Sequence, residues 1–456
     1  MTAVKAGDCG ASAVCRGCLG AAVSRRQFMA GMGGSLALPV LQAAPPSQAK
    51  DSARQAPIRT ALKVQPVLLY SISKRREATS WRPWSGLQTE QDAAAERERI
   101  SRELAQMKAG ADFPLEIGEV VPVRTADEAA AAAKGAHEVT LVYAASGGVQ
   151  ALEKLTPPDK WNLIFVRHRS GPVYLWYEIA HPRYLRKTVD EFGHPGMGVD
   201  DVVVDSHAEV LWRLRALGGL RNTLGKRIVA VGGPSGWGVG GKKAPTLARE
   251  VWKLDIQTVP YPDLGERIKR ARANDALVKR CRDAAGKYVK QKGVTLETKR
   301  EFLDNAFLLT EVFRDLLDEA KTDAITINQC MGTIMPISET TACMPLSLLN
   351  DEGYMAFCES DFVVIPSGIL LHYISGKPQF LNDPTYPHDG VVTIAHCTAP
   401  RKLDGARYEP ARILTHFESD YGAAPKVEMR KGQPVTNLVP DFDVKKWVGF
   451  LGEVID

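Results

Sequence analysis

The sequence predicts an α/β protein in which two doubly wound parallel-sheet domains precede a small antiparallel, barrel-like domain. Short apolar runs alternate with helical segments from residue 64 to about residue 360, a pattern typical of parallel sheets that helices cover on both faces. Beyond about residue 390, Gly and Pro separate short strand-like runs, and helix signals are absent. A length of 456 residues also exceeds that of one simple domain.

The composition is that of a globular chain and excludes several classes of protein. Apolar residues make up 45% and charged residues 24%, so a mainly disordered, collagenous or disulfide-stapled chain is excluded. The net charge of +5 comes without a clustered basic face, and we therefore expect no nucleic acid partner. No run of 18 or more apolar residues follows the N-terminus, so we expect no membrane span in the mature chain.

The N-terminal segment has the order of features of an export signal. Arg25 and Arg26 form a twin-arginine pattern, a weakly apolar stretch covers 29–41, and small residues follow at 43–49. This order predicts a signal and flexible leader over 1–57, recognition by the twin-arginine export machinery, and a periplasmic or other extracytoplasmic location. The alternative is a chance Arg-Arg pair before an Ala-rich linker.

Five cysteines follow this leader, an odd number that argues against a disulfide framework. Several have apolar, strand-like neighbours, so we expect buried thiols. These cysteines are Cys281, Cys330, Cys343, Cys358 and Cys397.

The first α/β domain is expected over 58–190. Thr89 is a plausible N-cap for a charged amphipathic helix at 89–108, and Thr125 with Glu128 forms a capping box that opens a second, Ala-rich helix. The expected strands are 67–72, 115–121, 139–143 and 163–166.

The second α/β domain is expected over 191–360, and the β-rich domain over 361–456. Helices are expected at 205–217, 245–253 and 344–350, with three more between 263 and 321. Strands are expected at 227–231, 256–259, 324–328 and 354–358, and later at 391–396, 411–417, 426–429 and 435–438. We expect both parallel sheets to be of the Rossmann or flavodoxin-like type, in which ligands bind at the carboxyl ends of the strands.

A Gly-rich segment follows the strand at 227–231. Gly236, Gly238 and Gly241 satisfy G-x-G-x-x-G, and the same residues match most of a P-loop, but Lys243 stands where Ser or Thr should be. The next helix starts later than a dinucleotide site requires. We therefore favour a flexible loop at a strand end over a nucleotide site, and we expect no nucleotide cofactor. The loop could still border a substrate pocket.

Acidic residues and histidines gather between 337 and 397. Glu359 and Asp361 directly follow a strand and alternate to the same side, so with a histidine from another strand they suit a divalent metal. The alternative for Asp361 is an N-cap of the helix that starts near residue 363. The cluster consists of Glu339, Glu359, Asp361, Asp383, His388, Asp389 and His396.

Several of these segments resemble the L-fucose isomerase and L-arabinose isomerase superfamily. They are 343–353, Cys358-Glu-Ser-Asp361, 375–383, Ala395-His396-Cys397, and the tail at 414–422 and 432–436. Ser80-Trp81-Arg82-Pro83-Trp84 resembles shorter members of this superfamily. The likeness runs from about residue 64 to the C-terminus, and the family architecture is two α/β domains followed by a barrel-like domain.

This resemblance implies a metal-dependent aldose–ketose isomerase that acts through an ene-diol, with a divalent metal, typically Mn²⁺. Asp361 matches the metal-binding aspartate by its local motif, and Glu339 takes the place of the other catalytic glutamate by its upstream position. Both are implied to hold the metal and to move the proton. His396 is the first choice for the histidine ligand and His416 the second, and Glu359 is a further candidate for the metal or the substrate.

The resemblance also implies a small-molecule sugar substrate and a homo-oligomer. Trp81 and Trp84 could stack on a sugar ring, although packing against the first helix explains them equally well. The competing interpretation of the whole chain is an exported, non-catalytic sugar-binding relative of the isomerase fold.

Overall fold

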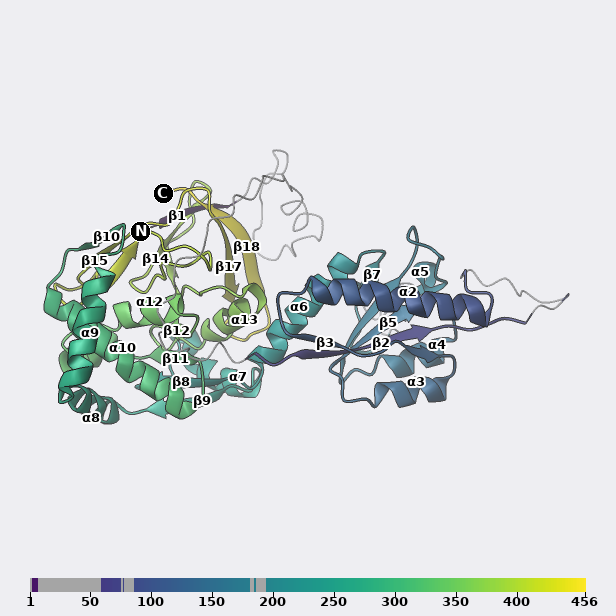
Figure 1. Ribbon diagram of the computed structural model, residues 1–456, viewed down its shortest axis with the longest axis horizontal. Helices are drawn as coiled ribbons and strands as arrows, with labels where there is room; N and C mark the ends of the chain where they lie inside the picture. The colour runs from purple at the N-terminus through teal and green to yellow at the C-terminus, as the bar shows by residue number, and fades with distance from the viewer. Residues whose placement is uncertain (1, 7–58, 75–76, 78–85, 181–183, 186–193) are drawn as a thin grey trace.

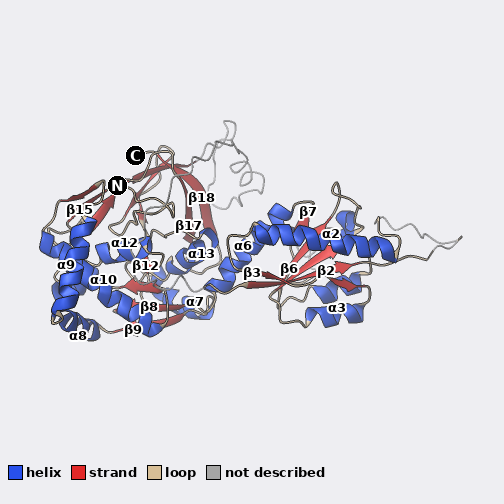
Figure 2. Ribbon diagram, viewed as in Figure 1, coloured by secondary structure: helices blue, strands red, loops and turns tan. Residues whose placement is uncertain are grey.

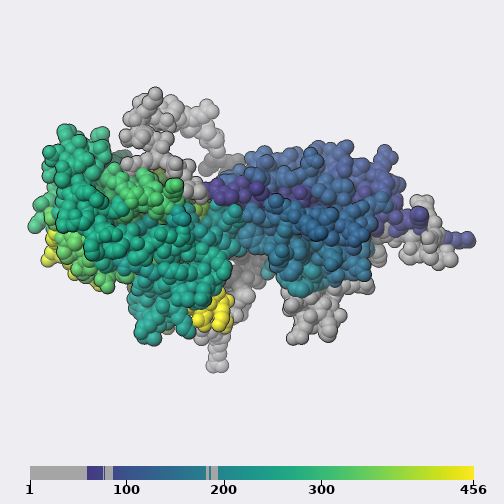
Figure 3. Space-filling view, turned by 90° about the horizontal axis from the view of Figure 1, so that it is seen from below, coloured from purple at the N-terminus to yellow at the C-terminus, as the bar shows by residue number. Residues whose placement is uncertain are grey.

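The structure is a computed structural model that describes residues 2–6, 59–74, 77, 86–180, 184–185 and 194–456. Arg25 and Arg26 of the predicted signal, and also Trp81 and Trp84, lie outside the described residues. The described chain forms two α/β parts side by side, with the antiparallel strands packed onto the second (Figure 1). The surface view in Figure 3 shows the same division between the purple and blue first part and the teal and green second part.

The first part is built on a parallel sheet with the strand order β3-β2-β5-β6-β7, in which β4 also pairs with β2. Numbered along the chain, with β3 and β4 as one position, this order is 2-1-3-4-5, which is compatible with a doubly wound fold. The strands are β2 (Leu62–Leu69), β3 (Leu115–Ile117), β4 (Val121–Val123), β5 (Val139–Ala144), β6 (Trp161–Val166) and β7 (Val202–Val204). The strand expected at 115–121 is thus two short strands, which pair with successive halves of β2.

Helices cover both faces of this sheet (Figure 1). One face carries α2 (Glu90–Ala109) and α6 (His207–Thr223), and the other carries α3 (Ala126–Ala133) and α4 (Val149–Leu155), while α5 (Trp176–Ile179) follows β6. Both predicted caps are confirmed, because the hydroxyls of Thr89 and Thr125 accept from the backbone amides of Asp92 and Glu128, and those carboxylates accept from the cap amides.

The second part is built on the parallel sheet β12-β11-β8-β9. Its strands are β8 (Arg227–Val231), β9 (Asp255–Val259), β11 (Ala324–Ile327) and β12 (Met355–Phe357). Its helices are α7 (Ala244–Glu250), α8 (Tyr261–Arg272), α9 (Asp275–Tyr288), α10 (Arg300–Ala320), α11 (Met335–Ser338), α12 (Cys343–Asp351) and α13 (Ile365–Ser375). No helix in the described ranges is long and apolar enough to cross a membrane.

Alternating side chains bury both faces of this second sheet. Val229 and Val231 face the core formed by α8, α10 and α12, whereas Ile228 faces the core formed by α7 and α13. A strand buried on both faces must be apolar throughout, which explains the continuous run from Ile228 to Val231 in the sequence.

The C-terminal strands form two separate open sheets. The first is β13-β14-β1-β18-β17 and is antiparallel throughout, and the second is β10-β15-β16. Their bounds are β1 (Thr2–Ala6), β10 (Val294–Leu296), β13 (Asp383–Pro384), β14 (Val391–Ala395), β15 (Ala411–Leu414), β16 (Ala424–Val427), β17 (Pro434–Pro440) and β18 (Trp447–Val454). The expectation of antiparallel strands is confirmed, but the described residues form no closed barrel, because no ladder joins the two sheets (Figure 2).

Several elements cross the predicted domain boundaries. Helix α6 lies beyond residue 190 but covers the first sheet, and β10 lies before residue 361 but pairs with β15. Strand β7 lies beyond residue 190 but pairs with β6 of the first sheet. Helix α13 lies beyond residue 360 but packs on the second sheet and against α6. Strand β1 lies inside the predicted signal and fills the position between β14 and β18.

The turn after β8 generates a testable prediction about stability. Gly232 has a φ of +77°, and a Cβ at this position would lie 2.0 Å from Oη of Tyr261, which donates a 2.8 Å hydrogen bond to the carbonyl of Asn328. We expect Gly232→Ala to destabilise the protein by about 2 kcal/mol or more, because it combines left-handed backbone strain with overpacking. A lower midpoint of urea unfolding is the measurement.

Gly238→Ala is the matched control for this substitution. Gly238 also has a positive φ, +67°, but nothing lies within 4 Å of a Cβ there. It should therefore carry the backbone strain alone and cost clearly less. Equal losses in the two variants would contradict the packing argument.

Candidate functional site

A cavity of about 780 Å³ opens between the second parallel sheet and the C-terminal strands. One wall comes from the loops at the carboxyl ends of β8, β11 and β12. The opposite wall comes from the ends of β14 and β15 and from β16. A cavity at this edge is where open parallel sheets bind ligands, and its volume suits a small molecule.

Hydrogen bonds between the strand-end loops fix the shape of the first wall. The amide of Ser360 donates to Oγ1 of Thr326 in β11 at 3.1 Å, and the amide of Ser235 donates to the Ser360 carbonyl at 3.0 Å. Glu359 and Ser360 have φ values of +63° and +49°, so the chain turns sharply directly after β12. The turn and its bonds leave the side chain of Glu359 facing the cavity.

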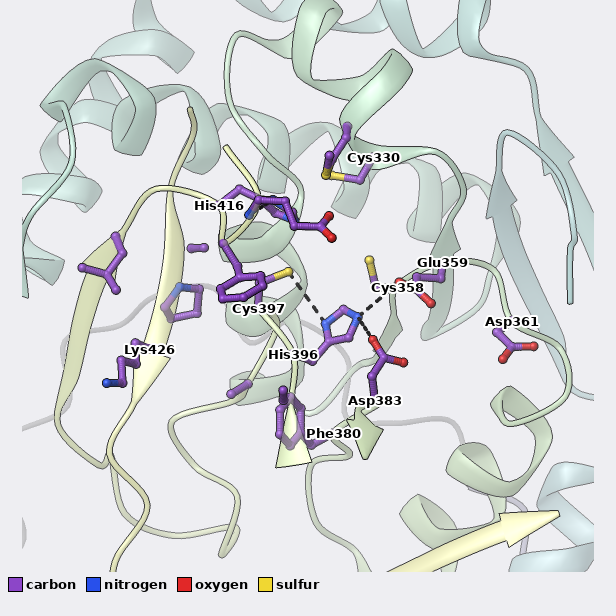
Figure 4. A pocket seen from close by; sticks show the side chains of 18 of the residues that line it. Cys330, Cys358, Glu359, Asp361, Phe380, Asp383, His396, Cys397, His416 and Lys426 are labelled. Atoms are coloured by element: carbon purple, nitrogen blue, oxygen red, sulfur yellow. Dashed lines mark hydrogen bonds and ion pairs between the residues drawn. The ribbon is translucent and has the colours of Figure 1, made fainter. Parts of the chain in front are cut away.

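Glu359 follows β12, Asp383 lies on β13 and His396 follows β14, so three potential metal ligands come together where the two walls face each other (Figure 4). Nε2 of His396 lies 3.7 Å from Oε1 of Glu359 and 3.9 Å from Oδ2 of Asp383. Two ligand atoms that share an ion at about 2.1 Å are separated by about 3 to 4 Å, so the spacing fits an ion between them. Two carboxylates and an imidazole are a donor set for Mn²⁺, Fe²⁺ or Zn²⁺.

The charges of this triad favour a cation. Burial raises the pKa of Asp383, and the negative charge of Glu359 raises it further. The adjacent His396 ring lowers the pKa of Glu359. Two carboxylates that repel each other gain most from a positive ion held between them.

The hydrogen bonds of the two candidate histidines separate their roles. Nδ1 of His396 lies 3.1 Å from the hydroxyl of Thr398, which can accept a hydrogen bond from Nδ1–H and leave the lone pair of Nε2 free to bind a metal. Nδ1 of His416 instead accepts the amide hydrogen of Glu418 at 3.2 Å, so a neutral ring carries its proton on Nε2. Burial lowers the pKa of His416, which favours the neutral ring. Of the two, His396 is the ring prepared to ligate, and His416 is prepared to donate a hydrogen bond.

Asp361 lines the same cavity but is not in the ligand triad. Its Oδ1 accepts from the amides of Val363 at 3.0 Å and Trp237 at 3.2 Å, but it does not cap α13, whose N-cap is Val364 without a side-chain hydrogen bond. Burial nevertheless raises the pKa of Asp361.

The structure does not bring Glu339 to these residues. Glu339 ends α11 in a left-handed conformation, with a φ of +53°, and its Oε1 pairs with Nη1 of Arg272 at 2.5 Å. Its side chain is half exposed and does not line the cavity. Its distance from the triad follows from the π-helical turn Cys330–Ile334 and α11, which separate it from the end of β11.

The Gly-rich loop borders the cavity, a position that the sequence analysis left open. Ser235 and Trp237 of this loop line the first wall. A Cβ at Gly236 would lie 2.1 Å from the carbonyl oxygen of Gly241, so these two glycines permit the loop to fold back on itself. The glycine pattern is thereby explained by close backbone packing.

Asp383 is a site residue that the sequence analysis did not select as a ligand. It pairs with Ala395 in the short ladder between β13 and β14, which places it beside His396. In the sequence, Asp383 belongs to the acidic cluster and lies thirteen residues before His396. Neither observation predicts the antiparallel register that brings the two residues together. No family model matches this chain, and no curated protein matches it either.

The geometry predicts which side chains bind a divalent ion. We expect His396→Ala to lower Mn²⁺ affinity more than tenfold, and Thr398→Val to lower it by about tenfold, because the hydroxyl orients the ring. Electron paramagnetic resonance titration of the full chain with Mn²⁺ measures both effects.

His388→Ala is the matched control, because His388 is an exposed histidine that pairs with Asp389 and does not line the cavity. It should leave Mn²⁺ affinity unchanged. Glu339→Gln separates the two ligand sets: a loss as large as that of His396→Ala would support the set implied by the resemblance against the one seen in the structure.

Proposed function

We propose that this protein is a metal-dependent sugar isomerase that interconverts an aldose and a ketose through an ene-diol. The observation that carries the proposal is the convergence of Glu359, Asp383 and His396 in a sugar-sized cavity. Three protein ligands leave coordination positions open, as catalytic metal sites require. A divalent ion held there would polarise the sugar carbonyl and stabilise the negative charge that develops on its oxygens.

Asp361 is the group we assign to the proton at C2 of the sugar. It lines the same cavity as the triad, and its raised pKa makes it a better proton acceptor than an ordinary aspartate. Its bonds to the amides of Trp237 and Val363 hold Oδ1 in place. The second oxygen of the carboxylate is then the atom that takes and returns the proton.

The cavity also provides contacts for the body of a sugar. Trp237 and Phe417 are 72% and 80% exposed although both line the cavity, so their faces are open to a ligand. Aromatic faces suit the C–H surface of a sugar. Nε2–H of His416 supplies a donor for a hydroxyl oxygen.

The family, the location and the assembly belong to the same proposal. The strand orders of the two parallel sheets support doubly wound domains like those expected for the L-fucose and L-arabinose isomerase superfamily. Twin-arginine export and a homo-oligomer remain proposals from the sequence. Cleavage of the signal would remove β1 and leave β14 and β18 without the strand that joins them.

The second candidate is a sugar-binding protein without turnover. It is favoured by the position of Glu339, which pairs with Arg272 instead of supplying a further carboxylate to the cavity. The proposed isomerase must therefore use Asp361 as its proton-transfer group.

Exchange of the C2 hydrogen in D₂O tests the proposal. We expect the full chain with Mn²⁺ to introduce deuterium into one sugar of a panel of aldoses, measured by mass spectrometry of the recovered sugar. Asp361→Asn should lower the rate by about 10²- to 10⁴-fold and should retain the metal. The rate should fall as the pH drops through the pKa of Asp361, above the ordinary value of 3.8, because only the carboxylate accepts a proton.

Asp389→Asn is the control, since Asp389 is almost fully exposed and does not line the cavity. It should exchange at the wild-type rate. If the metal-loaded wild type binds a sugar saturably but exchanges no C2 hydrogen, the protein is a sugar-binding protein and not an isomerase. Full exchange by Asp361→Asn would remove Asp361 from the mechanism.

A further inference from the structure

The fold gathers four of the five described cysteines beside the cavity. Cys330 and Cys358 follow β11 and β12, Cys343 begins α12, and Cys397 follows β14. Cys281 lies apart from them in α9. The proposed isomerase chemistry uses none of these thiols, so their convergence needs an explanation of its own.

Cys343 and Cys397 form the closest pair. The Cys343 thiol donates to Sγ of Cys397 across 3.2 Å, although the two residues are 54 positions apart in the chain. A disulfide has an S–S length of about 2.05 Å, so these atoms need to approach by about 1 Å to bond. Cys343 is buried, whereas Cys397 lines the cavity and is only half-buried.

We propose that Cys343 and Cys397 are a reversible disulfide site in the wall of the cavity. Its oxidant is a low-molecular-weight disulfide, or a disulfide-exchange protein, of an oxidising compartment. The pair is a thiol pair in the structure and becomes a cross-link between the start of α12 and the end of β14.

The reaction follows from the exposure of the two sulfurs. The Cys397 thiolate attacks one sulfur of the incoming disulfide, that S–S bond breaks, and the first thiol leaves with a proton. Sγ of Cys343 then loses its proton, attacks Sγ of Cys397 and releases the second thiol. The protein pair loses two electrons and two protons, and the oxidant is reduced to two thiols.

The environment of Cys343 explains this order of attack. A hydrogen bond with Cys330 acts in the opposite direction, but the bond to Cys397 and burial raise the pKa of the Cys343 thiol well above its ordinary value. A buried neutral thiol is a poor first nucleophile. It reacts once Cys397, its neighbour at 3.2 Å, carries a leaving group.

A thiolate metal site is the competing explanation for this cluster. Ligand atoms of Cys343, Cys397 and His416 do lie within 4.8 Å of one another. However, Nδ1 of His416 is already occupied by the amide hydrogen of Glu418, and its Nε2 carries the proton of the neutral ring. A metal-binding histidine usually donates a hydrogen bond from its other nitrogen, so His416 has the wrong tautomer for a ligand.

The disulfide would change the surroundings of the metal triad. Cys397 directly follows His396, and its Sγ lies 3.7 Å from Nδ1 of that ring. Bonding to Cys343 draws this sulfur toward α12. The cross-link also closes a loop between residues 343 and 397, which restricts the unfolded chain and should stabilise the folded one.

Disulfide mapping of the full chain tests the proposal. The reduced protein is incubated with oxidised glutathione. It is then unfolded in the presence of an alkylating reagent, which blocks the remaining free thiols, and digested. We expect one peptide pair that joins Cys343 to Cys397, a mass lower by two hydrogens for that pair, and a higher midpoint of thermal unfolding. Dithiothreitol should reverse all three changes.

Matched variants make the result specific. Cys281→Ser should still form the pair, while Cys397→Ser should leave Cys343 as an alkylated thiol, and Cys343→Ala should leave Cys397 free or bound to glutathione. Three results would overturn the proposal: both residues alkylated in the oxidised wild type, a different pair such as Cys330 with Cys343, or a zinc or copper ion retained by the wild type and lost from Cys397→Ser.

Discussion

The parallel pairing of β8, β11 and β12 is the constraint on which the site depends. Because these strands run in one direction, their loops leave the same edge of the sheet and must share the space beneath the C-terminal strands. Gln329 and Glu359 have left-handed backbone conformations that turn the chain shortly after β11 and β12. Hydrogen bonds between Ser235 and the 360–362 segment connect two of the loops. The cavity wall is therefore a property of the sheet and not of any single loop.

Most of the fold could be predicted because its signals are local. Alternation of apolar and helical segments marks parallel strands, and the caps at Thr89 and Thr125 depend on residues only three positions apart. Glu359 could be selected because it follows the strand expected at 354–358, whereas the choice of His396 rests on the resemblance. Asp383 could not be selected, because its place beside His396 comes from the register of β13 on β14. The position of Glu339 depends on the π-helical turn before α11, which has no local signal.

The roles of the two histidines are decided by their partners rather than by their distance from the cavity. A backbone amide can only donate, so the Glu418 amide determines the tautomer of His416. The Thr398 hydroxyl can accept, which permits the opposite tautomer at His396. One cavity thus holds a ring with a free lone pair beside two carboxylates and a ring with an N–H donor beside the thiols. This separates oxygen and nitrogen ligands for a hard ion from the sulfur atoms nearby.

The partners and the burial of Asp361 likewise determine its role. Two backbone amides bond to its Oδ1 and favour the charged form, yet burial outweighs them and raises its pKa. A carboxylate that is held by one oxygen and made more basic by burial is suited to accept a proton at the other oxygen. An ion ligand needs the reverse, a carboxylate that stays charged beside a cation. The bonds from the amides of Trp237 and Val363 therefore position Asp361 for proton transfer.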